Sequence, residues 1–144
     1  KAIERLSASV VILVFFSRPP MIRSTVSRKS CLPTNFFPCR AAISAWGLEN
    51  LCLDPALYSP VSTAVLLPEP YNADELRKLI LERYNLSLGM GLGKLKGRVF
   101  RIGHLGDCNA LTLIAALSGC EMGMRAFGIP LQASGVVAAQ ELLA

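Results

Sequence analysis

The 144-residue sequence contains a single histidine, and none of its five cysteines forms a CxxC pair. A Cys/His zinc site needs several such ligands at short spacing, so this composition nearly excludes one. A disulfide scaffold is equally unexpected, because the cysteine count is odd. We therefore expect free thiols in a reducing compartment at Cys31, Cys39, Cys52, Cys108 and Cys120.

Long apolar runs are also missing. The longest, VVILVFF at residues 10–16, has seven residues, whereas a transmembrane helix needs about 20. No small-residue cleavage site follows it in SRPPMIRS, so we expect neither secretion nor a membrane partner. The C-terminal ELLA is no peroxisomal address, which leaves the cytoplasm as the expected location.

Acidic residues are scarce at the start of the chain. Residues 1–40 carry seven Lys or Arg against Glu4 alone, whereas residues 41–144 carry eight against nine Asp or Glu. The net charge of +5 therefore belongs to the first segment. Since the remainder has no basic stripe for a phosphate backbone, we expect no nucleic-acid partner.

The composition divides the chain into two parts. Residues 1–40 are rich in Ser, Pro and Arg and show no sustained helical or alternating period. They fit either a flexible or disordered basic arm or a frame-disrupted stretch upstream of a genuine domain. Residues 41–144 have the apolar content of one folded domain.

The second part predicts alternating helices and strands. The expected elements are a helix ending at Gly47, a strand at 63–68, a helix at 73–85 capped by Asn72, a strand at 98–104, a helix from a cap at Asp107 or Asn109 to about 127, and a last helix from Ser134. This order indicates an α+β fold, with a short antiparallel sheet and helices on one face.

Arg101 is the residue that a purely structural strand does not explain. In RVFRIGH it stands among apolar neighbours, and alternation places it on the same face as Gly103, which leaves space beside it. A guanidinium in such a place fits a planar carboxylate held by two parallel hydrogen bonds. The alternative is an internal ion pair with Asp107 or Glu121.

Two further motifs have a structural and a chemical interpretation. GMGLGKLKG is not a phosphate loop, because Leu88 and Leu95 stand where the Walker pattern needs Gly and Ser or Thr. Its glycines favour tight turning and close approach instead. His104 could act as a general base, but without an orienting partner in the sequence a structural histidine that bonds the backbone is the favoured interpretation.

The remaining candidates lie around the helix that follows. Cys108, near the helix N-terminus, is either a reactive thiol or a small buried residue, the commoner role. Asp107 is explained as a helix cap. Glu121 is expected to form a structural salt bridge with Arg125, four residues further on.

The run from AWGLEN through GMGLGKLKG and FRIGHLGD to EMG and GIPLQASGVVAA resembles the C-terminal part of serine–glyoxylate aminotransferases. These are class V, fold-type I pyridoxal-phosphate enzymes. The likeness covers about residues 41–144, and residues 1–40 do not share it. It implies the small C-terminal domain of such an enzyme, with Arg101 binding the α-carboxylate of the substrate.

The resemblance further implies transfer of an amino group from serine or alanine to glyoxylate, by a homodimer that uses pyridoxal 5'-phosphate. None of the five lysines, Lys1, Lys29, Lys78, Lys94 and Lys96, stands in the Ser-Gln-Lys-Gly-like context of the Schiff-base lysine. The chain alone is thus expected to be an inactive fragment, and no cofactor-binding or catalytic residue is assigned in it. The alternative is a free-standing α+β module that binds a small carboxylate or a protein.

Overall fold

The computed structural model describes residues 36–105 and 108–144. Most of the basic segment, residues 1–35, lies outside the described residues, as does Asp107. The elements are α1 (Phe36–Trp46), β1 (Glu49–Asn50), β2 (Ser62–Leu66), α2 (Ala73–Tyr84), β3 (Gly89–Met90), β4 (Val99–Gly103), α3 (Ala110–Phe127) and α4 (Gly135–Glu141), with 3-10 turns η2 (Pro55–Leu57) and η3 (Gly93–Leu95).

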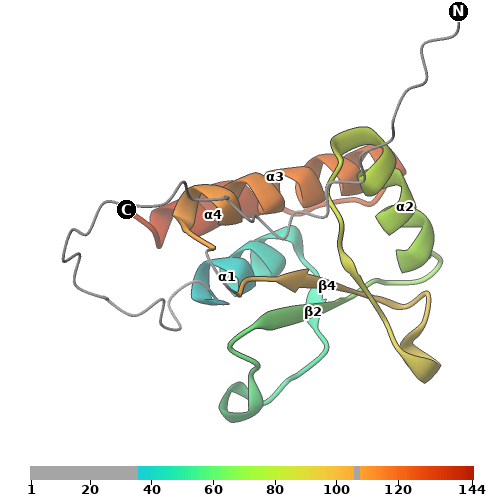
Figure 1. Cartoon of the computed structure of the whole chain (residues 1–144), viewed down its shortest axis with the longest axis horizontal. Helices are drawn as coiled ribbons and strands as arrows, with labels where there is room; N and C mark the ends of the chain where they lie inside the picture. Colours follow the sequence, from blue (N-terminus) through green and yellow to red (C-terminus); the bar gives the residue numbers. More distant parts are fainter. Residues whose placement is uncertain (1–35, 106–107) are drawn as a thin grey trace, which may run out of the picture.

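The strands form one antiparallel sheet in the order β1-β2-β4-β3. All the described helices lie on one side of it, above β2 and β4 in Figure 1. Helix α1 packs on β2 and α2 packs on β4, while α3 and α4 form a second layer against them. The predicted α+β class, with a short antiparallel sheet and helices on one face, is confirmed.

Alternation along the two central strands builds the core. Val65 of β2 lies opposite Phe100 of β4, and Thr63 lies opposite Ile102; all four are buried beneath the helices. Neighbouring residues of a strand point to opposite faces, so Ala64 of β2 and its partner Arg101 of β4 stand on the face without described helices. The helices contribute the largest fully buried partners, which are Trp46, Ile43, Leu76, Ile80, Leu113, Leu117 and Met124.

The helix ends follow the predicted capping chemistry. The Asn72 side chain accepts from the backbone N–H groups of Asp74 and Glu75, at 2.9 and 3.3 Å. Asn109 caps α3 through a reciprocal capping box with Thr112. Of the two caps expected for α3, Asn109 is therefore the one observed.

Three features differ from the sequence-based expectation. Helix α1 begins at Phe36, upstream of the expected boundary at residue 41, because Pro38 lies in its first turn, where a missing N–H costs nothing. The two-residue strand β1 was not expected, since Glu49 and Asn50 carry no β-strand pattern. The strand β3, at Gly89–Met90 in the glycine-rich stretch, was not among the expected elements either.

Helix α3 is long and apolar enough, by length and composition alone, to cross a membrane, a criterion that a buried core helix also meets. Here Leu113, Leu117 and Met124 are buried in the core of the domain. Gly119 and Gly123 let the helix approach its neighbours closely, since a Cβ at either position would collide with Leu86 or Ile80. The packing is that of a core helix.

The carboxylate of Glu121 joins three helices. It accepts from the Trp46 indole Nε1 on α1 at 2.9 Å and, through the same oxygen, from the Val136 backbone N–H on α4 at 3.2 Å. Ser134 donates to it at 3.2 Å, and the predicted Arg125 salt bridge is confirmed at 3.1 Å. Burial alone would raise the pKa of Glu121, but these donors outweigh it and hold the pKa below its usual value.

Replacing Glu121 with alanine is expected to reduce the free energy of unfolding by about 3 kcal/mol, because it leaves the buried Trp46 donor and the partly buried Val136 donor unsatisfied. Urea denaturation of the chain measures this. The matched control is Glu82→Ala, which removes an exposed partner of Lys78 (3.9 Å) and should cost no more than about 0.5 kcal/mol. An equal reduction of the free energy of unfolding in the two variants would contradict the stabilising role of Glu121.

Candidate functional site

Arg101 stands in the middle of β4 on the sheet face that carries no described helix. Three of its neighbours on that face are small: Ala64 lies opposite on β2, Gly89 lies opposite on β3, and Gly103 follows on β4, while Val99 precedes it on the same face. A Cβ at Gly103 would meet only Leu105, at 3.9 Å. The side chain is half-buried, so the desolvation cost that a fully buried guanidinium would carry is reduced.

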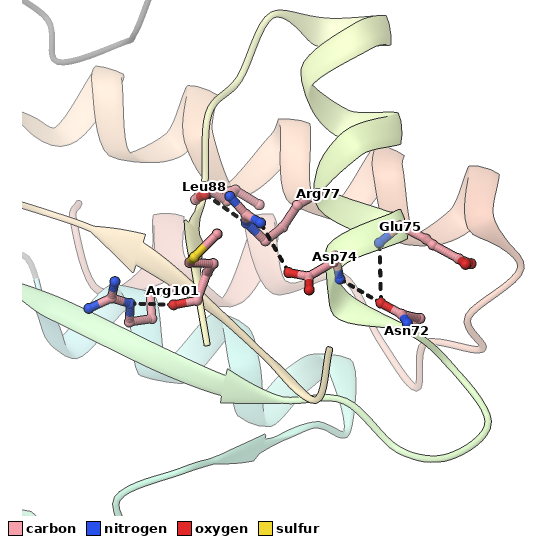
Figure 2. A network of polar contacts seen from close by, with 7 residues as sticks. Asn72, Asp74, Glu75, Arg77, Leu88 and Arg101 are labelled. Carbon is pink, nitrogen blue, oxygen red and sulfur yellow. Dashed lines mark hydrogen bonds and ion pairs between the residues drawn. The ribbon is translucent and has the colours of Figure 1, made fainter. Parts of the chain in front are cut away.

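The guanidinium is anchored at one nitrogen. Arg101 Nε donates to the backbone carbonyl of Met90 at 3.0 Å. Figure 2 shows the two terminal nitrogens of Arg101 pointing away from that carbonyl. Among the residues that the structure describes, no carboxylate lies within ion-pair distance of them.

A second arginine, Arg77 on α2, which the sequence did not single out, bonds a backbone carbonyl next to β3. Arg77 Nε on α2 donates to the carbonyl of Leu88 at 2.8 Å, and its Nη1 is paired with Asp74 at 3.1 Å (Figure 2). Arg77 therefore uses both ends of its guanidinium within the fold. Arg101 bonds only through Nε among the described residues, so both of its terminal nitrogens keep donors for a ligand.

The internal ion pair considered for Arg101 is not formed with Glu121. That carboxylate lies on α3, on the helical side of the sheet, and is paired with Arg125. The other candidate, Asp107, lies outside the described residues.

His104 lies on the core side of the sheet, away from Arg101. Its Nε2 is 2.9 Å from the Thr63 hydroxyl, and its backbone N–H donates to Val61. Burial lowers the pKa of His104, and the charge of nearby Arg40 lowers it further. The ring therefore bonds a side-chain hydroxyl through Nε2, where the sequence favoured a bond to the backbone.

The other candidates have local structural roles. Cys108 is half-buried just before the α3 cap, where its sulfur lies 3.7 Å from the Thr112 hydroxyl. In the glycine-rich loop, Gly93 and Gly97 have φ values of +56° and +75°, which favour glycine. No group of three or more His, Cys, Asp or Glu in the described part of the chain is placed to hold a metal ion.

The pH dependence of stability should report on His104. Since folding lowers its pKa below the unfolded value of about 6.5, the stabilisation is complete above that pH and is lost as pH falls below it. We expect stability to decline as the pH falls below about 6.5, by at most about 1.4 kcal/mol per pH unit. His104→Gln, which can keep a bond to Thr63, should flatten that slope in chemical denaturation. An unchanged slope would assign the dependence to other groups.

Comparison with known proteins shows what the chain is similar to. No family model matches the chain. It is similar to serine–glyoxylate aminotransferases of Arabidopsis thaliana and Methylorubrum extorquens, at 45% and 44% identity over 105 residues. An L-aspartate–glyoxylate aminotransferase of Paracoccus denitrificans is 43% identical over 103 residues. Each match covers 71–72% of this chain and 26% of the relative.

Solved structures agree with the sequence relatives. Pyridoxamine–pyruvate aminotransferase from Mesorhizobium loti matches with a TM-score of 0.71 and 30% identity, over 77% of this chain and 29% of that one. A ureidoglycine–glyoxylate aminotransferase from Bacillus subtilis, at 24% identity, shares the fold with a TM-score of 0.72. The chain is thus a homologue of the serine–glyoxylate aminotransferases, over a segment about a quarter of their length.

Proposed function

We propose that the chain is the C-terminal, substrate-carboxylate-binding part of a pyridoxal-phosphate-dependent aminotransferase. In this proposal an amino group moves from serine, or alanine, to glyoxylate, and Arg101 binds the α-carboxylate. The observation that carries it is the state of Arg101, which is anchored through Nε on the sheet face that carries no described helix, with its terminal nitrogens directed away from β3.

The chemistry of transamination suits a single arginine. Amino donor and keto acceptor both carry a carboxylate next to the reacting carbon, so one guanidinium can orient each in turn. Arginine meets a carboxylate with two parallel N–H donors, which fix direction as well as distance. The small residues around Arg101, Ala64 and Gly103, leave room for the bound acid.

The described residues do not fit the cofactor. Pyridoxal phosphate supplies the electron sink of transamination when bound, and it is held through a lysine. Lys78, Lys94 and Lys96 are all exposed, and Lys78 lies 3.9 Å from Glu82. We therefore assign the cofactor to segments that the relatives have and this chain does not match, and we derive no step through it here.

Other parts of the proposal follow from the relatives rather than from the site. Their names cover serine, aspartate and alanine as amino donors, so the preferred donor stays undetermined. We propose a homodimer for the complete enzyme and a cytoplasmic location. The apolar side chains of Leu53 and Leu57, in and before η2, are 80% and 73% exposed, which favours coverage of the surface around η2 by further protein.

The alternative, a free-standing module that binds a small carboxylate or a protein, rests on the same outward guanidinium. The two proposals differ in the expected behaviour of the isolated chain: a free-standing module binds glyoxylate by itself, whereas a segment of an aminotransferase needs the rest of the enzyme. Isothermal titration of the full chain with glyoxylate separates the two ideas. Binding at micromolar concentration would favour the module.

The chain alone should form no specific Schiff base with pyridoxal phosphate. Exposed lysines such as Lys78, Lys94 and Lys96 are expected to react weakly and without selectivity, because no described pocket holds the phosphate beside them. Borohydride trapping followed by peptide mass spectrometry measures this. Stoichiometric labelling of a single lysine would contradict the assignment of the cofactor to other segments.

Arg101→Ala should lower kcat/KM for the acids by about 30- to 700-fold, which corresponds to about 2–4 kcal/mol of transition-state binding. The assay uses a chimera in which residues 41–144 replace the matching segment of the Arabidopsis relative. Arg83→Ala, which removes an exposed arginine on α2, is the control and should leave kcat/KM unchanged. If Arg101→Ala behaves like this control, Arg101 does not bind the substrate.

A further inference from the structure

The path of the Arg101 side chain across β3 depends on a residue that has no side chain. Gly89 lies directly opposite Arg101 in the antiparallel pair. A Cβ at Gly89 would come within 3.0 Å of Arg101 Cβ and 3.1 Å of Arg101 Nε. Contacts this short are tighter than most real Cβ contacts, so a side chain at position 89 would require the arginine to shift by a few tenths of an ångström.

The acceptor for Arg101 exists because β3 is the edge strand of the sheet. The N–H of Gly91 donates to Val99 on β4 at 3.0 Å, which turns the intervening Met90 carbonyl away from β4. Such outward groups of an edge strand have no partner strand. Arg101 Nε satisfies this one, and Arg77 Nε satisfies the carbonyl of Leu88 in the same way.

Anchoring Nε decides which side of the guanidinium remains for a ligand. An arginine can offer a carboxylate either Nε with one terminal nitrogen, or both terminal nitrogens. With Nε engaged on Met90, only the pair of terminal nitrogens remains, and Figure 2 shows them directed away from β3. The direction of approach of the acid is set by this bond.

We propose that Gly89 is a positioning residue for Arg101. Its bare surface lets the arginine cross β3 and bond the Met90 carbonyl, which aims Nη1 and Nη2 at the substrate carboxylate. This inference rests on the proposed function for the identity of the ligand. The hydrogen bond itself does not depend on that function and is testable without any substrate.

The first test observes the bond in the full chain. In ¹⁵N NMR, the Arg101 Nε–H should exchange slowly with water, because it is hydrogen-bonded to Met90. Gly89→Ala should remove that protection, whereas Gly103→Ala, whose added methyl would make only an ordinary contact with Leu105 at 3.9 Å, should keep it. Protection that survives Gly89→Ala would overturn the inference.

The second test measures the consequence in the chimera. Gly89→Ala should lower kcat/KM about ten- to a hundredfold, mainly through KM. In an Arg101→Ala background the same substitution should change kcat/KM by no more than about twofold, because it acts through the arginine. A similar loss in both backgrounds would show general damage to β3 and overturn the inference.

The two proposals fail in different ways. If Arg101→Ala leaves kcat/KM intact, the proposed function fails, whatever the NMR result. If Arg101→Ala lowers kcat/KM and Gly89→Ala does not, the positioning role of Gly89 fails and the carboxylate role of Arg101 stands.

Discussion

Phe100 and Ile102 enter the core from one face of β4, and Arg101 between them must therefore stand on the other face. The fold and the candidate site both depend on this alternation. The described helices all lie on the face that Phe100 and Ile102 occupy (Figure 1), so the charged residue avoids the desolvation cost of the core. A shift of β4 by one residue would bury the guanidinium and expose the aromatic ring.

The domain satisfies most of the hydrogen-bonding groups of Arg77 and Glu121 internally, but fewer of those of Arg101. Arg77 and Glu121 are satisfied within the fold, the first by Leu88 and Asp74 and the second by donors from three helices. Arg101 is satisfied at Nε alone among the described residues. A side chain that is anchored at one end and open at the other is preorganised to bind without being saturated.

Periodicity and capping chemistry were sufficient to predict the major elements. Asn72, Asn109 and the alternation around Arg101 each act through local rules, and each was confirmed. The start of α1 was harder to predict, because Pro38 signals a break in most contexts and is tolerated only in a first turn. Strand β1 is too short to leave any pattern, since it forms only by pairing with β2.

The sequence singled out Arg101 but not the residues that surround it in the structure. Arg101 is conspicuous in the sequence because a charge interrupts an apolar strand. The roles of Gly89, Met90 and Arg77 depend on pairing between segments about ten residues apart, and a glycine or a backbone carbonyl carries no chemical signal of its own. His104 likewise has a partner, Thr63, that only the sheet register reveals.

The central claim is that Arg101 meets an acid from outside the domain through its two terminal nitrogens. The most direct measurement is a crystal structure of the chimeric enzyme with a bound carboxylate inhibitor. The account predicts both terminal nitrogens within about 2.7–2.9 Å of the two carboxylate oxygens, with Nε still on Met90. An inhibitor carboxylate held elsewhere, with Arg101 paired to an acidic side chain of the protein, would contradict it.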